Sequence, residues 1–305
     1  MSVADRSGAD TREPFAEPVV PPPAPPSLDA VLPPQIAEKA TDIGATKAGM
    51  STLPTFALAV LAGAFIGLGA MFATTVVAGA ADVVPFGVTR LLAGLVFCLG
   101  LILVVVAGAE LFTGNNLIAM AWAERKVSAA MLIRNWTIVY VGNLVGALGT
   151  VLLVFLGGQY EFGDGAIGSS ALAIADAKSG LGFGRALALG IMCNALVCLA
   201  IWLTYSARSV TDKILAIIFP ISAFVAAGFE HSVANMYFLP IGLAVKEWGS
   251  DSFYADSGVV AGDFGELTLS NVVVDNLIPV TIGNVIGGSV MVGLVYWLIY
   301  IRARG

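Results

Sequence analysis

His231 is the only histidine among the 305 residues, and it lies inside an apolar stretch of the chain. An unperturbed histidine titrates at about pH 6.5, so it is the side chain best able to change charge near neutrality. A protonated imidazole about 4 Å from a small anion would return roughly 4 kcal/mol of the anion's lost hydration at an effective dielectric near 20. His231 therefore predicts a site where an anion and a proton meet, and the alternative is a satisfied structural histidine.

Thr113 lies in an apolar stretch that is interrupted in the same way as the stretch around His231. Each interruption also contains one glutamate, Glu110 in the first and Glu230 in the second. The Thr113 hydroxyl can donate to an anion or orient the imidazole, and a threonine before Gly-Asn is equally a helix cap. Glu110 and Glu230 would repel an anion if they faced its path. We expect both carboxylates to accept hydrogen bonds from loop backbone or from helix amino ends instead.

Asn194 and Asn284 are polar residues within otherwise apolar stretches. Such side chains either join membrane helices by hydrogen bonds or line a polar path, and the sequence leaves both interpretations open. Cys98, Cys193 and Cys198 also lie in apolar stretches, without a Cys-x-x-Cys pair, and are expected to be packing residues. With a single histidine and no Ser-His-Asp set, the sequence predicts neither an enzyme nor a metal or cofactor site.

Membrane helices must position these residues. The chain is 58% hydrophobic and only 12% charged, with a mean hydropathy of +0.89, far from the composition of a water-soluble domain. Roughly 20 apolar residues cross a bilayer as a helix. Six stretches reach that length, near residues 53–81, 83–123, 127–157, 185–207, 213–245 and 272–301. We predict an all-α membrane protein with six transmembrane helices, in which the polar segments 159–183 and 246–271 are loops.

Two motifs occur twice along the chain. Gly-x-Glu, followed five residues later by Asn, begins at Gly108 and again at Gly228, an offset of 120 residues. Gly-Asn-x-x-Gly begins at Gly142 and again at Gly283, an offset of 141 residues. Copies that contain three spans each must cross the membrane in opposite directions, because three is odd. The sequence therefore predicts two inverted three-helix repeats.

The first motif interrupts the second and fifth apolar stretches, which are longer than one straight span needs. We predict breaks at 108–115 and 228–235, with half-helices that begin near Asn115 and Asn235. Irregular backbone at membrane depth is tolerated where protein or a water-filled cavity satisfies its polar groups. The positive amino ends of the half-helices favour an anion, so the breaks predict the position of a transport path.

The N-terminal region differs from the rest in composition. Residues 1–34 are rich in proline and are predicted to form a disordered cytoplasmic tail. Residues 35–50 are predicted to form an amphipathic cytoplasmic helix, with Ile36, Ala40 and Ile43 on one face. This helix is either a surface anchor or a plug or regulatory arm. Residues 51–305 are predicted to form the six-helix transmembrane channel domain.

Charge sets the predicted orientation. If the N-terminus is inside, only four of the 15 Lys and Arg residues lie outside, namely Arg90, Lys178, Arg185 and Lys246. Because Lys and Arg concentrate in cytoplasmic loops, both termini are predicted to be cytoplasmic. No basic patch indicates a nucleic-acid partner.

Four longer motifs resemble the signatures of the formate/nitrite transporter family, and the N-terminal part of the similarity resembles its formate-channel branch. The motifs are Ala109–Thr113, Asn135–Trp136 with Gly142–Ala147, Gly228–Met236 and Asp275–Asn284, within a resemblance that runs from about residue 31 to 301. Glu110 stands where formate channels often carry Asp. The two Asn-Pro-Ala motifs of aquaporins are absent.

This resemblance implies an aquaporin-like fold, a homopentamer with one pore in each protomer, and passage of formate and related small monovalent anions. It implies His231 and Thr113 as the central polar pair, with Asn194 and Asn284 near the path. It also implies apolar constrictions, formed by Phe97, Leu101, Leu111, Phe112, Val197 and Phe224. Lys178 is implied as a residue that attracts anions at the outer side.

The resemblance places the chain in the lipid bilayer of a bacterial inner membrane, with protons as a second partner. A nitrite or hydrosulfide channel of the same family remains open as an alternative. From a different class, the chain would be a membrane scaffold that docks a cytoplasmic, formate-metabolising enzyme through its N-terminal segment.

Overall fold

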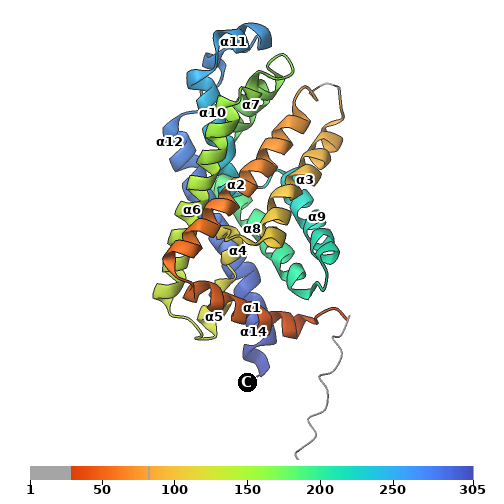
Figure 1. Ribbon diagram of the computed structural model, residues 1–305, viewed down its shortest axis with the longest axis vertical. Coiled ribbons are helices and arrows are strands. Elements are labelled where there is room, and N and C mark those ends of the chain that lie inside the picture. Colours follow the sequence, from red (N-terminus) through yellow and green to blue (C-terminus); the bar gives the residue numbers. More distant parts are fainter. Residues whose placement is uncertain (1–28, 82, 305) are drawn as a thin grey trace, which may run out of the picture.

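The computed structural model describes residues 29–81 and 83–304, and this part of the chain is built from helices (Figure 1). Six helical segments in it are long and apolar enough to cross a membrane, which confirms the predicted number of spans. In such a span every backbone polar group is satisfied within the helix, as a bilayer requires. The spans are α2 (Thr52–Val77), α3 (Phe86–Ile102) continued to Gly108, α6 (Ala129–Leu156), α8 (Phe183–Ser206), α9 (Val210–Ala227) and Leu269–Tyr300.

The last span is a composite of three α-helical pieces. These are α12 (Leu269–Asn271), α13 (Ile278–Val285) and α14 (Val295–Tyr300), and the residues between them are π-helical. The residues 103–108 at the end of the second span are also π-helical. Such widened turns often mark functional sites in helices.

Both breaks fall within the predicted ranges. Gly108 has a φ of 84° and Gly228 a φ of 76°, a conformation that glycine adopts without steric cost. The chain resumes as α4 (Phe112–Asn115), with α5 (Ile118–Ala123) behind it, and as α10 (Ser232–Trp248) in the second break. The half-helices thus begin three residues before the predicted starts at Asn115 and Asn235.

The two halves of the chain run in opposite directions. In Figure 1, α3 and α9 come from opposite ends of the molecule and stop near its middle, and α10 then continues to the end from which α3 came. A Cβ atom at Gly146 would collide with the carbonyl group of Val60, and one at Gly287 with that of Ile191. Equivalent glycines therefore let α6 lie against α2 and the last span against α8.

Two helices lie outside the spans where the sequence predicted only loops. The segment 159–183 contains α7 (Ala166–Ser179), and the segment 246–271 contains α11 (Asp251–Ser257). Helix α7 is too short to span a bilayer, and its buried residues Ala171, Leu172 and Ala175 face the protein, with α10 as its main neighbour. A search for long apolar stretches therefore misses it.

Helix α1 (Pro33–Gly49) lies at the opposite end of the molecule from α7 (Figure 1). It contacts α5, α8 and α6, and its residues Ile36, Ala37 and Ala40 are buried. It begins before residue 35, because proline is well suited to the first turn of a helix. Of the tail predicted at 1–34, residues 1–28 lie outside the described residues, and Pro33 and Pro34 belong to α1.

Candidate functional site

The structure brings His231 and Thr113 together, one from each break. The imidazole Nε2 lies 2.9 Å from the Thr113 Oγ1, and both residues are buried. His231 precedes the first residue of α10, and its Nδ1 accepts a hydrogen bond of 3.0 Å from the backbone N–H of Ala234. The first turn of α10 therefore fixes the orientation of the ring.

These two contacts define where the hydrogen atoms of a neutral His231 lie. Because Nδ1 accepts from a backbone N–H, the ring proton is on Nε2, which donates to the Thr113 oxygen. The hydrogen of the Thr113 hydroxyl must then point elsewhere. No other bond to this hydroxyl occurs among the described residues, so the pair presents one unshared hydrogen-bond donor inside an apolar break.

A cavity of about 1000 Å³ reaches His231 from the side of α2, α3, α7 and α9. Phe97 and Phe224 line it together with His231. The Phe224 ring is stacked on the His231 ring with 5.8 Å between centroids, and it meets the Phe97 ring edge-on at 5.6 Å. Two of the residues predicted to form constrictions thus lie beside the histidine.

The other four predicted constriction residues are buried in the same hydrophobic core, and they are Leu101, Leu111, Phe112 and Val197. Leu111 occupies the position of His231 in the first repeat, 120 residues earlier. The Phe112 ring packs edge-on against those of Tyr140, at 5.0 Å, and Trp136, at 6.3 Å. The repeats therefore differ at their centre, which is polar in the second break and apolar in the first.

Asn284 holds the second break in shape. Its Oδ1 accepts from the backbone N–H of Ser232 at 2.9 Å, and its Nδ2 donates to the carbonyl groups of Gly190 and Glu230 at 2.8 and 3.0 Å. Because Asn284 satisfies the N–H of Ser232, α10 can start at that residue. Between the two interpretations left open by the sequence, these contacts favour a joint between helices.

Asn194 is placed in the same way on α8. Its Nδ2 donates to the Asn284 carbonyl at 2.6 Å, to the Asn116 side chain at 2.8 Å and to the Thr113 carbonyl at 3.3 Å. It thereby links the two breaks through the backbone carbonyl of Thr113.

Asn143 is the counterpart of Asn284, and the sequence analysis did not select it. Its Oδ1 accepts from the Phe112 N–H at 2.9 Å, and its Nδ2 donates to the carbonyl groups of Ala59 and Glu110 at 2.7 and 2.9 Å. The repeated Gly-Asn-x-x-Gly motif contained the signal, because it places Asn143 and Asn284 at the same offset of 141 residues as the glycines.

Both glutamates are held in ion pairs. Lys178 Nζ lies 2.7 Å from Glu230 Oε1, and Lys47 Nζ lies 2.8 Å from Glu110 Oε1. The Oε2 atoms accept from Asn235 and Asn115, each at 2.7 Å. The expected acceptor role is therefore filled by lysine and asparagine side chains, rather than by loop backbone or helix amino ends.

Each ion pair is completed by an asparagine from the third span of its repeat. Asn135 accepts from Asn115 at 2.9 Å, and Asn276 accepts from Asn235 at 2.7 Å. Their Nδ2 atoms donate to the carbonyl groups of Lys47, at 3.2 Å, and Lys178, at 2.9 Å. The whole arrangement is thus duplicated, and α1 and α7 are equivalent helices that each contribute a lysine.

Comparison with known proteins agrees with this architecture. The family model described as Formate/nitrite transporter matches residues 34–298. The chain belongs to the formate/nitrite transporter family. Over 275 residues it is 46% identical to the formate channel FocA of Escherichia coli K12, covering 90% of this chain and 96% of that protein. It is 39% identical over 265 residues to FocA of Haemophilus influenzae, covering 87% and 93%.

Solved structures give the same result. A pentameric formate channel with formate bound has 46% sequence identity and a TM-score of 0.75, with 82% of this chain and 98% of that chain covered. An FNT family ion channel has 30% identity and a TM-score of 0.73, with 87% and 98% covered. The chain is thus a multi-pass membrane protein of a transporter family.

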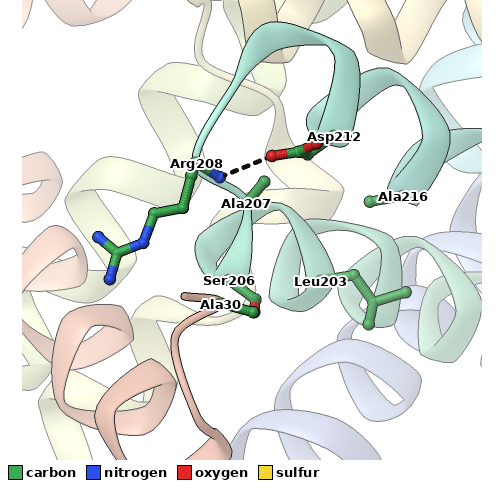
Figure 2. Close-up of a pocket in the computed structure, with 7 residues that line it drawn as sticks. All are labelled: Ala30, Leu203, Ser206, Ala207, Arg208, Asp212 and Ala216. Atoms are coloured by element: carbon green, nitrogen blue, oxygen red, sulfur yellow. Dashed lines mark hydrogen bonds between the residues drawn. The ribbon is translucent and has the colours of Figure 1, made fainter. Parts of the chain in front are cut away.

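This formate/nitrite transporter has a second, shallower cavity of about 430 Å³ at the turn between α8 and α9 (Figure 2). It is lined by Ala30, Leu203, Ser206, Ala207, Arg208, Asp212 and Ala216. The Asp212 carboxylate accepts from the backbone N–H of Arg208 at 3.1 Å, which closes the turn. None of the predicted site residues lines it, whereas Phe97, Lys178, Phe224 and His231 line the larger cavity.

Proposed function

We propose that this chain is a formate channel, which passes formate and related small monovalent anions. The observation that carries the proposal is the unshared Thr113 hydroxyl, held at 2.9 Å by His231, which itself lines a mainly apolar cavity. The similarity to formate channels supports formate as the substrate.

The site would lower the cost of moving an anion out of water. An anion that passes the Phe97 and Phe224 rings loses hydration, and the hydroxyl of Thr113 replaces part of it with a hydrogen bond to charge. The ordered Nε2–H of His231 keeps that hydroxyl in the donor orientation. Apolar walls make the single polar contact selective for a small anion, since a larger one would lack partners for its remaining acceptors.

Proton coupling is the second part of the proposal. His231 takes a proton from water at Nδ1 and releases the Ala234 N–H. Its Nε2 proton then passes to the Thr113 oxygen, while the Thr113 hydroxyl hydrogen passes to formate. One proton is gained at Nδ1 and one is lost at Nε2, so the ring ends neutral with its proton on Nδ1, and the substrate leaves as formic acid. The ring then takes a proton at Nε2 and returns the Nδ1 proton to water, which restores the hydrogen bond from the Ala234 N–H. Uptake should consequently depend on pH.

Membership of the family supports a proposal for the assembly and the location. We propose a homopentamer in the bacterial inner membrane with both termini in the cytoplasm, which would place α1 on the cytoplasmic side. The N-terminal segment would either regulate access from that side or dock a cytoplasmic formate-metabolising enzyme. Its contacts with α5 and with Glu110 support regulation.

The test is uptake into proteoliposomes by the full-length protein, with formate, nitrite and hydrosulfide compared at equal concentration. Formate should be taken up fastest, and empty liposomes give the background. Thr113→Val keeps the shape but removes the donor, and should lower uptake about tenfold or more, since a hydrogen bond to charge is worth about 1.5–3 kcal/mol. Thr113→Ser should retain most of it. Faster uptake of nitrite or hydrosulfide would reassign the substrate. If no anion is taken up, the remaining hypothesis is a membrane scaffold that docks a cytoplasmic enzyme.

A further inference from the structure

The described lining of the larger cavity contains a cation, Arg90, in addition to the Lys178–Glu230 ion pair. The charged side chains that line it are Arg90, Lys178 and Glu230, within the part of the chain that the structure describes. Lys178 and Glu230 lie 2.7 Å apart and neutralise each other, with side chains only 18% and 4% exposed. Among these described side chains, Arg90 is the cation that no ion pair offsets.

Arg90 is fixed at the edge of the second break. It lies in the first turns of α3, and its Nε donates to the carbonyl of Ala226 at 3.1 Å, while Nη2 donates to that of Val225. These carbonyls belong to the last turn of α9, where cations are favoured by the helix dipole. The guanidinium thus lies beside Gly228, on the same cavity wall as His231.

The guanidinium retains capacity for a ligand. An arginine has five N–H donors and stays protonated in proteins. The hydrogen bonds of Arg90 to the described residues occupy two of these donors, and the other three donate to no residue in that part of the chain. No carboxylate among the described residues forms an ion pair with it, in contrast to Lys178.

The second repeat has no counterpart to this arginine, which lies in α3 of the first repeat. The offset of 120 residues that relates the breaks places Val210 at the position equivalent to Arg90. The Lys47–Glu110 and Lys178–Glu230 pairs are duplicated, and each is neutral. The extra cation therefore belongs to one side of the membrane domain only, the side of α7.

We propose that Arg90, rather than Lys178, is the residue that gathers anions in the cavity on the α7 side before they reach Thr113 and His231. This inference rests on the proposed function. A fixed charge in a cavity with low-dielectric walls concentrates counter-ions, and salt screens that effect. Lys178 is a positioning residue, which holds the Glu230 loop and balances its carboxylate.

Initial formate uptake through the α7-side mouth tests this, in oriented proteoliposomes of full-length protein at low formate and low salt. Arg90→Gln should lower the rate roughly twofold to threefold, the size expected for one charge about 8 Å from the anion in a wet cavity. The deficit should vanish at high salt and at saturating formate. Arg90→Lys, which keeps the charge, should restore most of the rate. Arg185→Gln is the matched control, because it removes an exposed cation near the start of α8 that does not line the cavity.

Two results would overturn the inference. One is an Arg90→Gln channel with wild-type rates at low salt. The other is a loss that is equally large at high salt and at saturating formate, because it would show that Arg90 acts only as the cap of α9. A wild-type protein that takes up no anion would instead overturn the proposed function, and the inference would fall with it.

Discussion

Tyr140 and Thr281 form a hydrogen bond of 3.0 Å, although they occupy equivalent positions in the two repeats. They are 141 residues apart, the same offset that relates Asn143 to Asn284. Thr281 donates its own hydroxyl hydrogen to the carbonyl of Leu277 at 2.6 Å, so the Tyr140 hydroxyl is the donor in this bond. Two equivalent residues can touch only where the approximate two-fold axis between the repeats passes, so the pair marks that axis beside the Phe112 ring.

Tyr140→Phe should lower the free energy of unfolding by about 1 kcal/mol, because it removes one buried hydrogen bond and leaves the Thr281 donor satisfied. The aromatic contact with Phe112 is kept, so uptake at saturating formate should stay near the wild-type rate. Thermal unfolding in detergent measures the first effect and a liposome assay the second. A large loss of uptake with normal stability would show that the tyrosine hydroxyl belongs to the transport path.

The Lys178–Glu230 pair should behave as a unit. Lys178→Gln leaves a carboxylate that is almost fully buried without its cation, and should cost about 3–5 kcal/mol of stability. Lys178→Gln combined with Glu230→Gln should recover most of that cost, because no unpaired charge remains. The midpoint of thermal unfolding in detergent measures both.

Lys126→Gln is the control for this comparison. Lys126 and Asp42 form an ion pair of 2.6 Å whose side chains are 37% and 70% exposed, so breaking it should cost no more than about 1 kcal/mol. If Lys178→Gln is as mild as Lys126→Gln, or if the double variant is no better than the single one, the pair does not balance a buried charge.

Much of this fold could be predicted from repeated spacing. The Gly-x-Glu motif located both breaks, and the Gly-Asn-x-x-Gly motif located both asparagines that hold them, although only Asn284 was selected. Helix α7 was missed, because its residues are too few and too polar for a span. Its equivalence to α1 rests on Lys178 and Lys47, which are 131 residues apart in segments that share no motif.

The site was less predictable than the fold. The sequence provided His231 and Thr113, but their contact crosses 118 residues and depends on how the repeats face each other. The lysines that pair with Glu110 and Glu230 come from helices outside the spans, 63 and 52 residues away. Arg90 lies at the edge of an apolar stretch, where an arginine is ordinarily a membrane-interface residue, and only the structure shows that it lines the cavity.

Helix α1 should influence uptake from the cytoplasmic side. Removing residues 1–28 should leave formate uptake unchanged, because α1 and its Lys47–Glu110 pair of 2.8 Å remain. Removing residues 1–49 should change the rate or its pH response, because Glu110 loses its cation and Asn115 loses the 3.0 Å bond from Lys47. Uptake curves that coincide for all three proteins, with pentamer size unchanged, would reduce α1 to a surface anchor.

His231→Asn should flatten the pH dependence of formate uptake between roughly pH 5 and 8, the range around the unperturbed pKa of histidine. Asparagine can still accept the Ala234 N–H and can still donate toward Thr113, so the break should keep its shape. It cannot take a proton at one atom and release one at another, which is the step that proton coupling needs. Uptake of the anion without its proton should therefore persist and become independent of pH. The decisive measurement is the slope of uptake against pH, with folding and assembly checked by the size of the purified oligomer. A His231→Asn channel that assembles and keeps the wild-type slope would remove the histidine from the coupling step and leave it the structural task of orienting Thr113.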